Sequence, residues 1–143
     1  MRGPYSRRDF ERSARLLGVP FKMPEPFPFP SQAACRAVYW AGDRDAARGK
    51  ALAKAIYHAA FGEGRDVQAP EDVIAIAGTV GVDKASLGAA LEDPVVKERL
   101  KKETEMAVAR GVFGSPFIFV DGEPFWGHDR LAQVGRWLES GGW

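Results

Sequence analysis

The sequence is poor in cysteine and histidine, the two side chains that most often carry redox or metal chemistry. Among 143 residues it contains one cysteine, Cys35, and two histidines, His58 and His128. A single cysteine cannot form a disulfide within the chain, and without a Cys-x-x-Cys pair a dithiol redox enzyme is excluded. The histidines lie far apart in the sequence, so no cysteine and histidine cluster predicts a metal site.

The chain also lacks an excess of charge of one sign and a long apolar run. Its 20 basic residues nearly balance its 19 acidic ones, for a net charge of +1. We therefore expect neither a nucleic acid nor a membrane as a partner. The first ten residues, MRGPYSRRDF, lack the apolar core of a secretory signal. These absences predict a cytoplasmic protein, and the length predicts one domain.

Helical periodicity and capping residues predict that most of residues 6–110 are helical. We expect Ser6 to cap the first helix, with Asp9 three residues later completing a capping box. Asp43 and Asp45 are alternative starts for the third helix. The predicted helices run over residues 6–17, 31–41, 43 or 45 to 61, 70–77, 83–91 and 93–110.

Three features of these helices have structural interpretations. Alanines recur every four residues from Ala47 to Ala59, a spacing that allows close helix packing. We expect His58 to be partly buried on this alanine-rich helix. We expect Cys35 to be a packing residue, because free cysteine is among the most buried residue types.

Residues 19–30 contain five prolines and three phenylalanines, a composition that predicts an extended segment. This segment has two interpretations. It is either a connector whose phenylalanine rings cover the core, or its rings form one wall of an apolar pocket. Phe27, Phe29 and Trp40 are the candidates for a substrate pocket, although core packing explains them as readily.

The residues from Gly111 onward predict a hairpin followed by a helix. Pro116 precedes an apolar strand, Phe117–Val120, and proline is best placed at the start of a strand. Asp121-Gly122 predicts a type I′ turn before a second strand, Glu123–Trp126. We expect a helix over residues 130–139, capped by Asp129. Its inward side chains would be Leu131, Val134 and Leu138.

This hairpin is incomplete as a sheet. Two strands alone are marginally stable in water, and Phe117–Val120 is apolar on both faces, as interior strands are. The sequence predicts no strand before it. Either the chain is a fragment or another molecule completes the sheet.

Several motifs occur together in the order expected of one known family. Residues 111–131 contain a GVFG approach, a Ser-Pro step, an apolar strand, an Asp-Gly turn, an aromatic FWG end and an Asp-Arg pair. Residues 5–21 add a helix that leads into a proline-rich segment. This order resembles the thioredoxin-like family that includes 2-hydroxychromene-2-carboxylate isomerase and kappa-class glutathione transferase. The resemblance covers nearly the whole chain.

The resemblance implies an α+β, mostly helical thioredoxin-like fold with a helical insertion over residues 31–110 and an incomplete sheet within residues 111–143. It implies a cis bond at Ser115-Pro116, whereas position alone does not, because few X-Pro bonds are cis. It also implies glutathione as cofactor, held by Ser115, Pro116, Trp126, Gly127, His128, Asp129 and Arg130. Considered without the family, Asp129 is a helix cap, and Arg130 and His128 are surface groups.

The chain departs from the family at its N-terminal side. The family begins with a strand–helix–strand unit that carries an activating serine in a Ser-Pro-Tyr motif, and we expect that unit to be absent here. Tyr5-Ser6 imitates the motif, but we interpret Ser6 as a helix cap. The catalytic residue is therefore unassigned, and whether the chain is an active enzyme is open.

Two functional hypotheses follow. The first is a glutathione-dependent isomerase or transferase that acts on a small aromatic or unsaturated substrate. The second is a catalytically incomplete fragment that associates through its unfinished sheet, since unpaired apolar strand edges favour association. We expect a homodimer.

Overall fold

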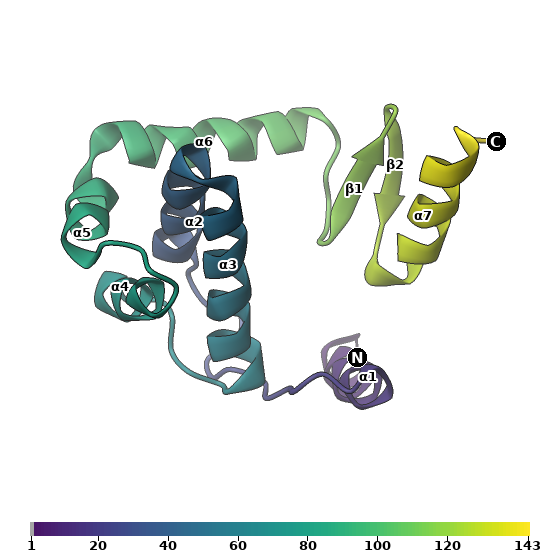
Figure 1. Ribbon diagram of the computed structural model, residues 1–143. Helices are drawn as coiled ribbons and strands as arrows, with labels where there is room; N and C mark the ends of the chain where they lie inside the picture. The colour runs from purple at the N-terminus through teal and green to yellow at the C-terminus, as the bar shows by residue number, and fades with distance from the viewer. Residues whose placement is uncertain (1) are drawn as a thin grey trace. The chain divides into compact units, whose positions relative to one another are not determined.

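The computed structural model describes residues 2–143, and side chains from Tyr5 onward. The chain divides into two compact units, one running to Lys101 and the other from Lys102 to Trp143. The first unit is helical and the second contains the sheet (Figure 1). This composition confirms the predicted mostly helical α+β class.

The first unit consists of helices and the segments that connect them. The elements are α1 (Arg2–Leu17), α2 (Gln32–Arg44), α3 (Ala46–Tyr57), a π-helical turn η1 (His58–Gly62), α4 (Pro70–Thr79), α5 (Lys84–Glu92) and the first half of α6 (Pro94–Ala109). The apolar faces of α2, α3, η1, α4 and α5 form one core, in which Leu52, Val73 and Leu87 have no exposed surface. Residues 19–30 are extended between α1 and α2, as predicted, and the bonds before Pro26 and Pro28 are cis.

Aspartates begin three of these helices. Asp45 accepts a hydrogen bond from the Arg48 N–H (3.1 Å), so the later of the two predicted starts is correct for α3. Asp83 and Asp93 cap α5 and α6 in the same way, accepting backbone bonds of 2.8 Å. Each side chain satisfies an N–H that has no partner within its helix.

The predicted cap at Ser6 is wrong. The helix α1 begins at Arg2, so Ser6 lies inside it and no capping box forms with Asp9. Pro4 falls in the first turn, where its missing N–H costs nothing because that position has no partner in the helix. Ser31 does stand at the N-cap position of α2, but its side chain makes no cap bond.

Helices α2 and α3 come into close backbone contact at two glycines that the sequence interpretation overlooked. A Cβ on Gly49 would lie 2.5 Å from the Cα of Gly42 and 2.8 Å from its nitrogen. The alanines at every fourth position from Ala47 to Ala59, which were expected to allow close helix packing, contribute less to it. Ala47 is exposed, and among the four only Ala59 is buried. The helix backbones therefore meet at Gly42 and Gly49.

The second unit contains the end of α6, strands β1 (Phe117–Val120) and β2 (Glu123–Trp126), a 3₁₀ turn η2 (His128–Arg130) and helix α7 (Leu131–Ser140). Both strands have their predicted bounds. They pair antiparallel, with Phe117 opposite Trp126 and Val120 opposite Glu123. Asp121 and Gly122 have φ of 53° and 87°, and positive φ at both positions is what a type I′ turn requires.

Helix α7 packs on the hairpin by a face that only partly overlaps the predicted one. Its Trp137 ring contacts that of Phe125 (5.8 Å between centroids), and its Nε1 donates to Asp121 Oδ2 at 3.0 Å. These contacts turn position 137 inward. Of the three side chains that were expected inside, Val134 is half-buried, whereas Leu131 and Leu138 are 55% and 68% exposed.

Within residues 2–143, no helix combines the length and apolar character that crossing a bilayer requires.

The glycine contact between α2 and α3 predicts that alanine destabilises the fold at one of the two glycines but not at the other. Gly49→Ala should lower the free energy of unfolding by about 1–3 kcal/mol, because the added methyl overlaps a rigid backbone. Gly42→Ala is the matched control, since a Cβ there lies 3.9 Å from Gly49 Cα, an ordinary contact distance. Urea unfolding of both variants measures the difference. Equal loss of stability in the two would contradict the close approach of the helices at Gly49.

The cap on α5 predicts a pH dependence of stability. Hydrogen bonds from the side chain and backbone N–H of Ser86 lower the pKa of the Asp83 carboxyl from its usual 3.8. A carboxyl with a depressed pKa in the folded state stabilises the fold above its unfolded-state pKa, and loses that contribution as the pH falls through the folded-state value. Asp83→Ala should therefore be less stable than the parent at neutral pH, and the difference should shrink below pH 3.8.

Asp83→Asn is the control for this titration, because asparagine caps a helix as well as aspartate does but carries no charge. Urea unfolding over a pH series compares the three proteins. A difference between Asp83→Ala and the parent that stays constant through the acid range would rule out the titrating cap.

Candidate functional site

In the second unit, the hairpin register brings the Ser-Pro step beside the start of the last helix. The bond between Ser115 and Pro116 is cis, as the family resemblance implied. The N–H of Gly127 donates to the carbonyl of Pro116 at 3.0 Å, one step beyond the pair of Phe117 and Trp126. The two separate stretches from which seven site residues were predicted, residues 115–116 and 126–130, therefore meet at Pro116 and Gly127.

The backbone of Ser115 has unused hydrogen-bonding capacity. Among the hydrogen bonds of the described residues, none involves its N–H or C=O. The residue is exposed and lies two positions before β1. A backbone donor and acceptor at a strand end can pair with an extended peptide-like ligand.

The turn before α7 is built differently from the prediction. Asp129 does not cap the helix, because it lies within η2 and α7 follows only at Leu131, with no side-chain cap. Gly127 has φ of 107°, a backbone conformation that residues with a side chain rarely adopt. This conformation turns the chain from β2 into η2. The Arg130 N–H donates back to the Gly127 carbonyl at 3.2 Å, which closes this turn.

The charged groups of this turn are at the surface. Asp129 Oδ2 pairs with Arg130 Nη1 at 3.0 Å, and their side chains are 62% and 46% exposed. His128 is exposed in the same turn. The Asp129 carboxylate therefore remains accessible to a cation or a hydrogen-bond donor from solution.

Trp126 forms an aromatic wall on this surface. It is 54% exposed, and its ring meets that of Phe113 edge to face, with 4.9 Å between centroids. The indole lies against Gly114, where a side chain would collide with it. The glycine at position 114, which ends the GVFG segment, therefore leaves room for the Trp126 indole.

In the first unit, Phe27 and Phe29 line a cavity of about 410 Å³ between the proline-rich segment, α2 and α3. Their rings lie 6.4 Å apart and both contact Phe61. Tyr57 joins this group by stacking on Phe61. Sequence interpretation missed Tyr57 and Phe61 as pocket residues. Their four-residue spacing on one helix was the available signal.

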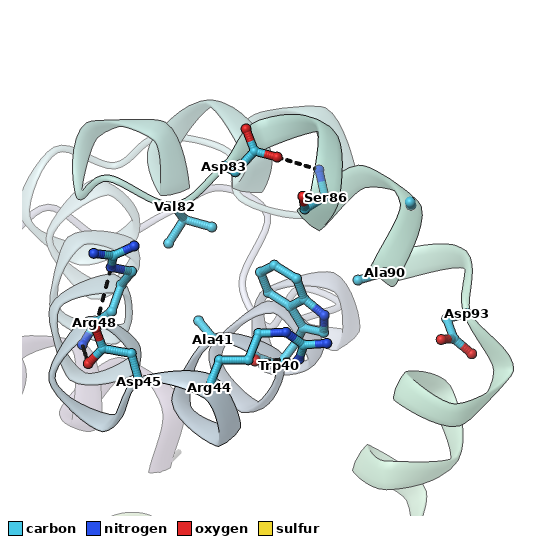
Figure 2. A pocket seen from close by; sticks show the side chains of 11 residues that line it. Trp40, Ala41, Arg44, Asp45, Arg48, Val82, Asp83, Ser86, Ala90 and Asp93 are labelled. Atoms are coloured by element: carbon cyan, nitrogen blue, oxygen red, sulfur yellow. Dashed lines mark hydrogen bonds and ion pairs between the residues drawn. The ribbon is translucent and has the colours of Figure 1, made fainter.

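Trp40, the third predicted pocket residue, lines a different hollow, of about 550 Å³, shown in Figure 2. The Arg44 guanidinium lies over its ring at 4.2 Å and donates to its carbonyl. Arg48 faces Asp45 across 3.7 Å and also donates to the Gly81 carbonyl. Arg48 is thus paired with a carboxylate, whereas the partners of Arg44 are a neutral carbonyl and an aromatic ring.

The remaining candidates do not gather into a reactive centre. Cys35 is half-buried and its Sγ lies 3.8 Å from Ser31 Oγ, in keeping with a packing role. His58 is 58% exposed beside Glu63, contrary to the expectation of partial burial, because it begins η1 at the end of the helical core. No three His, Cys, Asp or Glu side chains among those described are grouped so that they could hold a metal.

Comparison with known proteins gives a consistent result. Residues 1–139 match the family described as DSBA-like thioredoxin domain. A 2-hydroxychromene-2-carboxylate isomerase of Sphingobium xenophagum is 36% identical over 130 residues, which are 91% of this chain and 65% of the relative. One of Pseudomonas putida is 28% identical over the same length, 62% of that protein.

A solved structure of a 2-hydroxychromene-2-carboxylate isomerase has the same fold. It superposes with a TM-score of 0.83 at 29% sequence identity, covering 95% of this chain and 65% of that one. The chain thus spans a little under two thirds of the length of these relatives. The match confirms the thioredoxin-like fold that the motifs predicted.

Proposed function

The chain belongs to the DsbA-like thioredoxin domain family, and we propose that it is a glutathione-dependent protein of the 2-hydroxychromene-2-carboxylate isomerase type. The observation that carries the proposal is the hydrogen bond from the Gly127 N–H to the Pro116 carbonyl. It holds a free backbone edge at Ser115 next to a turn that contains a carboxylate and helix N–H groups. Glutathione needs these features at its cysteinyl and γ-glutamyl ends.

The cysteinyl part of glutathione would lie along Ser115. The unused N–H and C=O of Ser115 can pair with the peptide groups of the ligand, as an added strand does. Trp126, exposed on the next strand, offers an apolar wall beside this edge. Because the contact is made by backbone atoms, serine at position 115 is as suitable as other residues.

The γ-glutamyl end would lie at residues 127–130. Backbone N–H groups at the start of a helix favour a carboxylate, and Asp129 can receive the α-amino group in a charge-assisted hydrogen bond. Arg130 holds the Asp129 carboxylate in place through its ion pair. His128 can add a further donor to the ligand's carboxylate.

Bound glutathione would supply a thiol that adds reversibly to an aromatic or unsaturated substrate. Phe27 and Phe29 are the proposed contacts for that substrate, whereas Trp40, which was predicted with them, lines a separate hollow. The catalytic group is unassigned, because the family's Ser-Pro-Tyr motif does not occur in these 143 residues. The proposal includes a cytoplasmic location, which the lone cysteine supports.

A glutathione titration tests the assignment. Asp129→Asn should weaken binding by about tenfold or more, because a charge-assisted hydrogen bond to the amino group is lost. Glu139→Gln is the matched control, since it removes an exposed carboxylate from α7 in the same unit. Isothermal titration calorimetry measures both. The absence of binding by the parent chain, or equal affinity in the parent and Asp129→Asn, would reject this site.

A second candidate function is association through the sheet. The specific observation is that the sheet of the described residues has only two strands. Strand β1 pairs with β2 along one edge, and no strand of the described residues pairs with its other edge. All four β1 side chains are half-buried at most, and an apolar strand edge favours pairing with another strand. A second copy of the chain could supply that strand, giving a homodimer.

Light scattering after size-exclusion chromatography tests this candidate. The parent should be a dimer at micromolar concentration, and Phe119→Lys should shift it towards monomer, because lysine on an edge strand opposes pairing. Met106→Lys, which adds the same charge to an exposed position of α6, should leave the dimer intact. A monomeric, well-folded parent would refute association through β1.

A further inference from the structure

The helix α1 lies outside the core of the first unit. None of its described side chains belongs to the buried core. Two contacts seat one side of the helix on the proline-rich segment, residues 19–30. Phe10 meets the Phe21 ring with 6.4 Å between centroids, and Arg7 pairs with Glu25 at 3.1 Å. The opposite side of the helix is left to solvent.

That opposite side carries Tyr5, Arg8, Arg12 and Leu16, which we call the free side of α1. These residues are three or four positions apart, so they lie along one line on the helix. Tyr5 is 63% exposed and Leu16 is 85% exposed. The two arginines between them are exposed as well. Two cations thus stand between two apolar groups on one solvent-facing line.

The charge of α1 is locally positive. The helix contains five arginines against two acidic residues, an excess that the net charge of +1 for the whole chain conceals. Arg12 pairs with Asp9. Arg8, and Arg15 at the border of the free side, have no ion-pair partner among the described residues. These two cations are available to an anion from outside the chain.

This mixture of groups suits a lipid surface better than a protein groove. Helices that bind in protein grooves present an apolar stripe apart from their charges. At a bilayer surface, in contrast, a leucine reaches the acyl carbons while an arginine beside it extends to the phosphates. A tyrosine is also favoured at that boundary, because its ring is apolar and its hydroxyl is polar.

We infer that the free side of α1 binds the surface of an anionic lipid bilayer. The helix would lie in the plane of the surface, with Tyr5 and Leu16 at the boundary of headgroups and acyl chains and the arginines on the headgroup phosphates. The inference goes beyond the proposed function and requires neither glutathione nor a residue of the second unit. Composition predicted no membrane partner because it averages the charge over the whole chain.

Co-sedimentation of the full chain with vesicles tests the inference. The chain should bind vesicles of mixed phosphatidylcholine and phosphatidylglycerol at least about tenfold more tightly than vesicles of phosphatidylcholine alone, because only the mixed vesicles are negatively charged. Added salt should weaken this binding, since it screens exposed charges. No binding to the anionic vesicles at low salt, or equal binding to both kinds, would overturn the inference.

A pair of double variants locates the charged contact. Arg8→Gln combined with Arg15→Gln should lower the affinity for anionic vesicles by about tenfold or more. Lys50→Gln combined with Lys54→Gln is the matched control, since it removes two exposed cations from α3, and it should bind nearly as the parent does. An equal loss of affinity in both would mean that net charge, and not α1, determines binding, which refutes the inference.

A second pair of variants tests the apolar contact. Leu16→Gln retains a helix propensity close to that of leucine and should lower vesicle affinity by about fivefold. Val95→Gln, at a position of α6 that is 74% exposed, should have no effect. Circular dichroism checks that each variant keeps its helical fold. Unchanged binding in a folded Leu16→Gln variant would refute contact with the acyl chains.

Soluble polyglutamate distinguishes a lipid surface from an acidic protein. It offers negative charge without an apolar layer, so it should compete only weakly with anionic vesicles for the chain. Complete displacement from the vesicles at an equal concentration of negative charge would assign the free side to an acidic protein partner and overturn the lipid inference. Glutathione is absent from all of these assays, so their failure would leave the proposed thiol site standing.

Discussion

The register of the hairpin is the constraint on which the candidate site depends. Asp121 and Gly122 form a two-residue turn with positive φ at both positions, which pairs Phe117 with Trp126. The next step along the strands places the Pro116 carbonyl opposite the Gly127 N–H. A shift of one residue would invert every side chain of a strand and would break this contact. Asp121 also accepts the Trp137 indole N–H, so one turn residue both sets the register and orients the last helix.

The first unit follows a different principle, close approach of helices. Gly49 lies against Gly42 where α2 crosses α3, and small residues at a crossing let the backbones come within contact distance. Towards the other end of the same helix pair, the large rings of Phe29 and Phe61 pack against the core. With Phe27 and Tyr57 they surround an open volume rather than fill it. Small residues at one end and bulky rings at the other thus give the pair both a core and a cavity.

The two units offer different chemistry. Residues 115–130 present backbone hydrogen-bonding groups, an exposed carboxylate and an indole, which suit a peptide-like ligand with charged ends. The cavity of the first unit presents aromatic faces without charge. The relatives that share its fold extend beyond the part that this chain matches, which is 65% of their length.

The sequence by itself determined the elements whose causes are local. The hairpin bounds, the aspartate caps at Asp83 and Asp93, and the proline-rich extension follow from residues a few positions apart. Motif order also sufficed to identify the fold family. Tertiary structure alone decided which face of α7 is buried, since that depends on Asp121 and Phe125 meeting Trp137. It also separated Trp40 from Phe27 and Phe29 and brought the helix backbones together at Gly42 and Gly49. Burial and contact across distant segments are properties of packing, and single-chain periodicity carries no information about which of several apolar faces a partner will cover.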